Sequence, residues 1–222
     1  MKFLLFASII AFCLFITIFL RLPILPIVII FIIILTISIN NSNKKMKQQT
    51  EKFWEKEHKA NFVRKKPLDG LTYLTIPEHF LSMPVSKEDT HALDALDMLK
   101  HLSSQKIVNL TGITNTDLKL TYGTANITVL TQYDQNYTQL AHALQQLADS
   151  LAGNDHPKEA MEVLEYAIST RTDISASYLL LADLYIADGH PEKLESLINT
   201  ASSLDTLLAP SIVRNLKSKT GE

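Results

Sequence analysis

The chain has 222 residues, a formal net charge of −2 and a single cysteine, so it cannot contain an intramolecular disulfide. The near-neutral charge conceals an uneven distribution: nine basic residues face three acidic ones between positions 44 and 66, whereas ten basic residues face twenty acidic ones from position 67 onward. A nucleic-acid-binding protein needs its basic face on the folded domain. We therefore expect no nucleic-acid partner.

Two apolar segments open the chain, at residues 3–20 and 22–39, with Arg21 between them. Each is about long enough to cross a hydrocarbon core, which takes roughly 20 helical residues. Pro23 and Pro26 lie at the junction, where each removes a helix donor. The pattern predicts a transmembrane helical hairpin over residues 1–40, with helices at about 3–20 and 23–39 in the lipid bilayer. A cleaved signal peptide is the alternative, but no A-x-A-like site precedes Arg21.

A basic segment follows at residues 41–66 and contains no glycine or proline, so it is predicted to be a juxtamembrane helix. Lysine and arginine close to a membrane span mark its cytoplasmic side. We therefore expect a multi-pass cell-membrane protein with a cytoplasmic C-terminal domain. The residues expected at the membrane surface are Lys44, Lys45, Lys47, Trp54, Arg64, Lys65 and Lys66. A solvated, charged stalk is the alternative interpretation of this composition.

Residues 67–85 contain three prolines and a glycine and are predicted to be an irregular linker, in which residues 71–76 could pair as a short strand with residues 106–110. Residues 86–140 are predicted to form a helical N-terminal cap. One helix starts with a capping-box-like sequence from Ser86 to Asp89, and its inward residues are expected to be Leu93, Leu96 and Leu99. A shorter helix is expected to start at Thr114 and to end at Gly123.

The same turn sequence occurs twice near the C-terminus, as His156-Pro157 and His190-Pro191, 34 residues apart. Apolar residues repeat at this spacing, and within each copy they recur at i, i+3, i+4 and i+7, on one face of a helix. The pattern predicts two helical hairpins at residues 141–207. Their predicted core consists of Leu144, Leu147, Ala148, Leu151, Ala160, Leu164, Ala167, Tyr178, Leu181, Ala182, Tyr185, Leu194, Ile198 and Ala201.

The second copy reads Tyr178-x2-Leu181-Ala182-x2-Tyr185, followed by Leu194, Ile198 and Ala201. This pattern resembles the tetratricopeptide repeat. The first copy matches it with Leu144 and Leu151 in the aromatic positions, and neither copy has the closing proline. The layout also resembles uncharacterised membrane-anchored tetratricopeptide proteins of Gram-positive bacteria. The resemblance implies a mainly α fold, an α-solenoid-like domain of stacked helical hairpins, with a capping helix and tail at residues 208–222.

Proteins of this repeat family bind peptides on the concave surface formed by the first helix of each pair. By that resemblance, the partner-binding groove would contain His142, Gln145, Asp149, Ala176, Leu179, Asp183 and Ile186. The mixture of acidic and apolar residues would suit a basic or amphipathic segment of a protein partner, because Asp149 and Asp183 attract cations. The alternative is that both aspartates are ordinary solvated helix residues.

A second surface could bind a partner, at residues 106–137, which are rich in Asn and Thr. Tyr122, Tyr133 and Tyr137 could anchor a partner there, because aromatic residues contribute strongly to interfaces. Alternatively, this stretch is a cap that packs its tyrosines against the first repeat. Its three glycosylation-type sequons, at Asn109, Asn126 and Asn136, are interpreted as chance matches.

Motifs of known enzyme classes are absent from the sequence: it has no glycine-rich phosphate loop, HExxH, CxxC or G-x-S-x-G. We expect no enzyme, no cofactor and no metal; Asp94, Asp97 and His101 share a helix face, but spacing alone specifies a metal site poorly. The expected function is a membrane-tethered scaffold or adaptor that recruits a partner at the cytoplasmic face. The alternative is an extracytoplasmic, signal-anchored assembly or folding factor.

Overall fold

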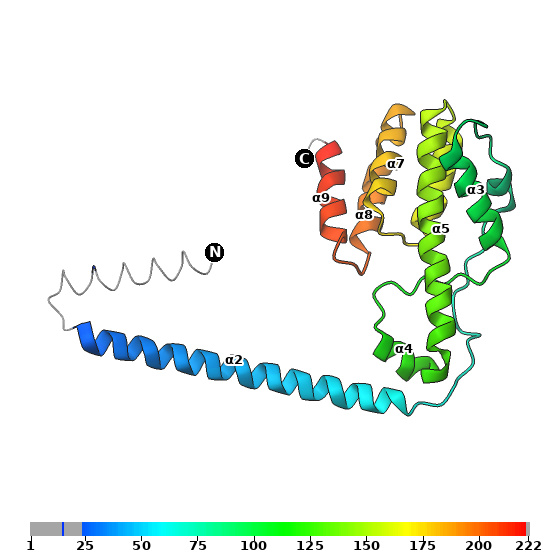
Figure 1. Cartoon of the computed structure of the whole chain (residues 1–222). Coiled ribbons are helices and arrows are strands. Elements are labelled where there is room, and N and C mark those ends of the chain that lie inside the picture. The colour runs from blue at the N-terminus through cyan, green and yellow to red at the C-terminus, as the bar shows by residue number, and fades with distance from the viewer. Residues whose placement is uncertain (1–14, 16–23, 221–222) are drawn as a thin grey trace. The chain divides into compact units, whose positions relative to one another are not determined.

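The computed structural model describes residue 15 and residues 24–220, and within them all regular structure is helical, without a β-strand. The mainly α class is therefore confirmed. The chain divides into two compact units, Met1–Lys59 and Ala60–Glu222, whose elements are shown in Figure 1.

The described part of the first unit is dominated by one continuous helix, α2, which runs over Ile24–Asn61 into the first residues of the second unit. Within α2, the stretch Val28–Asn61 is long enough to cross a membrane, and its first part is apolar enough to do so. The first predicted transmembrane segment, residues 3–20, lies outside the described residues apart from residue 15. The two helices predicted at residues 23–39 and 41–66 form one continuous helix, because no proline or glycine interrupts residues 27–66. This helix ends at Asn61, five residues before the predicted end.

Residues 63–66, predicted to be helical, instead pair with the turn after α4 (Asn115–Tyr122). The Lys66 N–H donates to the Tyr122 carbonyl at 2.9 Å, and the Thr124 N–H donates to the Val63 carbonyl at 3.4 Å. Gly123 has a φ of 88°, and a Cβ at this position would lie 2.3 Å from the Arg64 carbonyl oxygen. Only glycine allows this approach of the two backbones.

Residues 67–85 are more than a linker, because they contribute side chains to the main core. The short 3-10 helix η1 (Glu78–Ser82) buries Phe80, and Ile76 and Met83 on either side of it are buried as well. The Phe80 ring packs edge-on against Tyr166 at 5.4 Å between centroids. The expected pairing of residues 71–76 with 106–110 is limited to one backbone hydrogen bond, Leu74 N–H to the Ile107 carbonyl at 3.0 Å, and forms no strand.

Helix α3 (Thr90–Ser103) is capped by Asp89, whose carboxylate accepts from the Ala92 N–H at 3.0 Å. The expected inward face is partly wrong: Leu96 and Leu99 are buried, but Leu93 is exposed and Ala92 is buried instead. The predicted limits of α4 are confirmed, since Thr114 is its N-cap and Gly123 its C-cap. A second 3-10 helix, η2 (Thr124–Asn126), then leads into α5.

The rest of the second unit consists of α5 (Ile127–Gly153), α6 (Pro157–Ser169), α7 (Ser175–Ala187), α8 (Lys193–Ser202) and α9 (Ala209–Thr220). Helices α5 and α6 form one hairpin and α7 and α8 a second, while α3 packs on α5 and α9 packs on α7 and α8 (Figure 1). Pro157 is the first residue of α6, where its missing N–H is harmless. Pro191 lies two residues before α8, so the repeated turn is not identical in the two hairpins.

Candidate interaction surface

The predicted groove residues lie on two neighbouring helices, three on α5 and four on α7. Five of the seven are exposed, namely His142, Asp149, Ala176, Asp183 and Ile186. Leu179 is half-buried against the core, and Gln145 is only 8% exposed. We use the name α5–α7 surface for these five exposed residues together with Leu179.

Gln145 holds the two helices together and does not face solvent. Its Oε1 accepts a hydrogen bond from the Ser177 hydroxyl at 2.6 Å, and Ser177 is fully buried. Its amide NH₂ donates to the Asp149 carboxylate at 2.9 Å, one turn along α5. The assignment of Gln145 to a partner-binding groove is therefore wrong for the free protein, because its polar atoms are already used inside the fold.

Asp183 already has a cation beside it within the same chain. The Lys219 ammonium on α9 donates to the Asp183 carboxylate and forms an ion pair with it. An ammonium this close offsets much of the negative charge that the sequence places on α7. The two aspartates of this surface therefore differ in their partners. The Asp183 carboxylate is paired with an ammonium, whereas the Asp149 carboxylate accepts a hydrogen bond from the neutral Gln145 amide.

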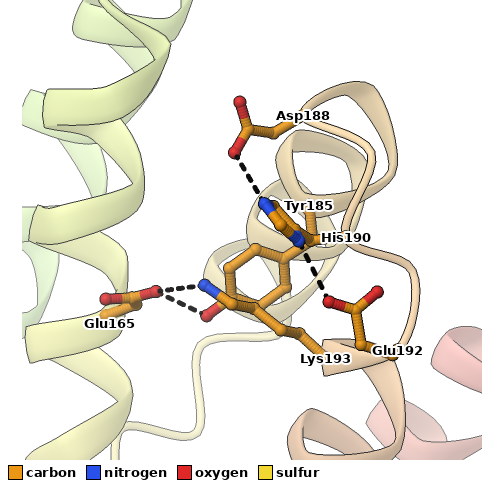
Figure 2. A network of polar contacts seen from close by, with 6 residues as sticks. All are labelled: Glu165, Tyr185, Asp188, His190, Glu192 and Lys193. Carbon is orange, nitrogen blue, oxygen red and sulfur yellow. Dashed lines mark hydrogen bonds and ion pairs between the residues drawn. The ribbon is translucent and has the colours of Figure 1, made fainter.

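A second polar cluster connects α6, α7 and α8 around the turn between α7 and α8 (Figure 2). The Tyr185 hydroxyl donates to the Glu165 carboxylate at 2.7 Å, and the Lys193 ammonium lies 3.7 Å from the same carboxylate. The ammonium also lies 4.7 Å from the centroid of the Tyr185 ring, within the range of a cation–π contact. These three side chains border a pocket of about 330 Å³, which is also lined by Ile168, Leu181, Ser196, Leu197 and Thr200.

The chemistry of this cluster is that of a structural connection. Burial, followed by the hydrogen bond and negative charge of Glu165, raises the pKa of Tyr185 well above its usual range. The phenol therefore stays protonated and acts as a donor, not as a base or nucleophile. Beside it, His190 lies between Asp188, at 3.7 Å, and Glu192, at 3.0 Å (Figure 2).

The two histidines of the repeated turns occupy ordinary turn positions. His156 is the N-cap residue of α6, and its N–H donates to the Leu151 carbonyl at 2.9 Å. The His190 N–H makes the matching bond to the Tyr185 carbonyl at 2.8 Å. The same backbone bond thus closes both hairpins, although Pro157 starts α6 directly and Pro191 lies two residues before α8.

The predicted repeat core lies inside the second unit. Ile198 is half-buried, and every other member of the predicted set is buried. The Tyr178 hydroxyl donates to the Thr172 carbonyl at 2.9 Å, and burial as the main cause raises the pKa of Tyr178 to about 12. The sequence pattern did not identify the polar partners of these tyrosines, since Glu165 and Thr172 lie outside the repeated apolar positions.

Of the three tyrosines in residues 106–137, Tyr137 alone belongs to the main core, as expected for a cap on the first repeat. Tyr137 is buried, and its hydroxyl donates to the Thr170 carbonyl at 3.2 Å. Tyr122 and Tyr133 pack against a small second core made of Val108, Leu110, Leu118 and Leu130. The amide groups of Asn126 and Asn136 are buried and donate to main-chain carbonyls, which leaves them inaccessible to a glycosyltransferase in the folded chain.

The residues predicted to lie at a membrane surface fall in both units. Lys44, Lys45, Lys47 and Trp54 are exposed on α2, whereas Arg64, Lys65 and Lys66 belong to the second unit. Lys66 donates to the Leu120 carbonyl at 3.2 Å and so helps to hold the segment against α4.

Within residues 24–220, no group of three His, Cys, Asp or Glu side chains is arranged to hold a metal ion, and the candidates Asp94, Asp97 and His101 lie exposed along α3. No family model, no curated protein and no solved structure matches this chain.

Proposed function

We propose that this chain is a membrane-tethered adaptor, which recruits a protein partner through the α5–α7 surface at the cytoplasmic face of a bacterial membrane. In this proposal α5 to α9 form a tetratricopeptide-like stack, with α9 as its capping helix. The apolar part of α2 is the tether, and recruitment raises the local concentration of the partner at the bilayer.

The orientation is supported by the charge of α2. Lys44, Lys45 and Lys47 follow its apolar part directly, and lysines within about 15–20 residues of a span favour the cytoplasmic side. The test is a reporter fused after Glu222 that is active only outside the cytoplasm. We expect no activity from it, and an active fusion would contradict the cytoplasmic orientation.

One observation carries the adaptor proposal: the α5–α7 surface presents an apolar side chain on a rigid support. Ile186 is 43% exposed, and the half-buried Leu179 lies two turns earlier on α7. The support is rigid because the buried Gln145–Ser177 hydrogen bond joins α5 to α7, and because α9 packs on α7. A preformed surface of this kind loses little conformational entropy when it binds a partner.

The chemistry of the surface suits an amphipathic segment. The apolar side of such a segment would cover Ile186 and Leu179, while a basic residue would approach Asp149. Asp183 contributes less to this recognition, because Lys219 already pairs with it. An aliphatic anchor surrounded by polar residues is a common arrangement at protein interfaces.

The experiment is a cross-linked pull-down from native membranes. The test variant combines Ile186→Glu with Asp149→Lys, and it leaves the Asp183–Lys219 pair intact. The matched control combines Leu93→Glu with Asp94→Lys on α3, because Leu93 is an exposed apolar residue beside an exposed aspartate. We expect a specific partner to be lost with the test variant and kept with the control. Retention of the same partners by both variants would show that this surface does not recruit them.

A further inference from the structure

The chain enters the second unit at Ala60, and hydrogen bonds from α4 and η2 hold the residues that follow. These bonds join residues 60–66 to residues 119–126, and we use the name entry clamp for the two stretches together. They run, donor first, from Lys119 to Asn61 at 2.9 Å, Thr124 to Ala60 at 3.1 Å, Lys66 to Leu120 at 3.2 Å and Asn126 to Lys66 at 2.8 Å. The two backbone bonds of Lys66 and Thr124 described above cross between the same stretches. Side-chain and backbone bonds together thus fix both ends of residues 60–66.

The entry clamp rests on the small second core, which is separate from the main one. Helix α4 has eight residues and packs mainly on η2 and α5. The main core, which contains the buried side chains of α6 and α7, shares none of the four buried residues of the second core. A region with so little buried apolar surface opens at a lower cost in free energy than the main core does.

Gly123 allows the two stretches of the entry clamp to approach each other. Its φ is 88°, and an added Cβ would lie 2.3 Å from the Arg64 carbonyl oxygen and 2.9 Å from the Lys65 Cα. Both atoms belong to the backbone, so no side-chain rotation could relieve the clash. Gly189, in the turn between α7 and α8, has a similar φ of 80°, but an added Cβ there would meet no non-neighbouring atom within 4 Å. An alanine at either position adds the strain of a positive φ, and only at Gly123 does it also force the entry clamp apart.

We propose that the entry clamp opens while the main core stays folded, and that its opening lengthens the connection between the two units. In the closed state residues 62–73 belong to the compact second unit, where Leu71 packs against the second core. Once the entry clamp is open, this stretch can extend to roughly 40 Å, at about 3.3–3.6 Å per residue. The released stretch ends before Ile76, because that side chain is buried in the main core.

The consequence for the adaptor is a change in its reach. If α2 spans a membrane as proposed above, an open entry clamp increases the distance from the bilayer at which the second unit can hold a partner. This consequence rests on the proposed tether, whereas the opening of the entry clamp rests only on contacts inside the second unit.

The test is limited trypsin digestion of the full chain in detergent. Trypsin cleaves after Arg64, Lys65 and Lys66, whose side chains are exposed but whose backbone lies in the entry clamp. A protease acts on the transiently opened state, so the cleavage rate at these residues reports how often the entry clamp is open. We expect Gly123→Ala to raise this rate about tenfold or more, and Gly189→Ala to leave it within about twofold of the rate in the parent chain. With Gly123→Ala, amide hydrogen exchange should speed up in α4 and stay slow in α6.

Thr124→Val is a milder variant, because it removes only the hydroxyl bond to Ala60. It should raise cleavage at the same three residues by a smaller factor, and it decides the question if Gly123→Ala does not fold. The proposal is wrong if neither variant is cut faster than the parent chain, or if Gly189→Ala raises the rate as much as Gly123→Ala does. It is also wrong if exchange in Thr124→Val speeds up equally in α4 and α6, because the second unit would then open as a whole.

Extraction of native membranes with alkaline carbonate tests the tether separately. If carbonate releases the chain while the trypsin results are as expected, the entry clamp stands and its effect on reach from a bilayer is wrong. If the chain stays in the membrane and the variants are cut no faster, the tether stands and the entry clamp is wrong. Retention together with faster cleavage of Gly123→Ala and Thr124→Val supports both.

Discussion

The first hairpin, α5–α6, buries Leu144 and Leu151 at the positions where the second hairpin, α7–α8, buries Tyr178 and Tyr185. A buried leucine needs only close packing, whereas a buried tyrosine also needs a partner for its hydroxyl. Tyr178 finds it in the Thr172 carbonyl and Tyr185 in the Glu165 carboxylate. The same repeat spacing is therefore stabilised in two ways, by apolar packing in one hairpin and by packing plus polar anchors in the other.

The neighbours of the two hairpins differ as well. Helix α5 has 27 residues and is covered by α3, while α7 has 13 residues and is covered by α9. The second helix of the first hairpin, α6, packs against both α5 and α7, but α8 packs against α7 and α9 near the end of the chain. We infer that the second hairpin is the less stable of the two and depends on α9. Each prediction below can contradict or sharpen that inference.

The largest expected effect is the loss of a buried leucine from the first hairpin. Leu164→Ala should lower the free energy of unfolding by about 3 kcal/mol, within the usual range for deletion of a buried leucine side chain. The equivalent change in the second hairpin, Ile198→Ala, should cost only about 1 kcal/mol, because Ile198 is half-buried. Urea unfolding in detergent, followed by circular dichroism, measures both. If both substitutions lowered the free energy of unfolding equally, the two hairpins would not differ in how much their second helices contribute to stability.

The next effect tests the dependence on α9. Ile212 is fully buried, so Ile212→Ala should cost about 2 kcal/mol. Because α9 packs on α7 and α8, amide hydrogen exchange should speed up in those two helices and stay slow in α5 and α6. Uniformly faster exchange in all four helices would mean that the hairpins unfold as one cooperative unit.

Much of this arrangement could be predicted from the sequence, because the apolar spacing identifies the inward face of a helix without reference to its neighbours. The 34-residue repeat thus located Leu147 and Leu181, both buried in the structure. The N-cap of α4 could also be predicted from the sequence, since the Thr114 side chain accepts from the Asp117 N–H at 3.2 Å. The break expected between the apolar and basic parts of α2 was wrong because a change in composition does not end a helix.

The candidate surface was harder to predict because burial outside the apolar face depends on which helix covers it. Gln145 occupies the repeat position of Leu179. Its hydrogen bond with Ser177 depends on the packing of α7 on α5, which the sequence pattern does not show. Lys219 is 36 residues from Asp183, and no local pattern connects them. Asn136, an unfavourable residue inside a helix, is buried in α5 because it donates to the Lys106 carbonyl at 2.9 Å.

A smaller effect separates the polar anchors from the packing. Tyr178→Phe keeps the ring and removes the hydrogen bond to Thr172, at a cost of about 1 kcal/mol at neutral pH. The pKa of Tyr178 is raised from 10.0 to about 12, so its contribution is fully present below pH 10 and is lost as the pH rises toward 12. The stability of the parent chain should therefore fall toward that of the phenylalanine variant over this window, as measured by urea unfolding at each pH. Tyr166 and Tyr185, whose pKa values are also raised mainly by burial, are present in both chains and cancel in the comparison, whereas the charge of Tyr137 contributes to the raised pKa of Tyr178 itself. A constant difference across the window would show that Tyr178 does not titrate there.

The smallest effect concerns the ion pair that joins the capping helix to the α5–α7 surface. Lys219→Ala removes the cation beside Asp183, and since such pairs are partly solvated we expect a loss of at most about 1 kcal/mol. The same variant exposes a second carboxylate on the surface, so it should bind a basic partner more tightly while it slightly weakens the second hairpin. Lys217→Ala on the same helix is the control, since the ion pair of Asp183 is formed with Lys219. Stability and partner binding that fall together would mean that α9 itself contacts the partner, and the recruiting surface would then extend from α5 and α7 onto the last helix.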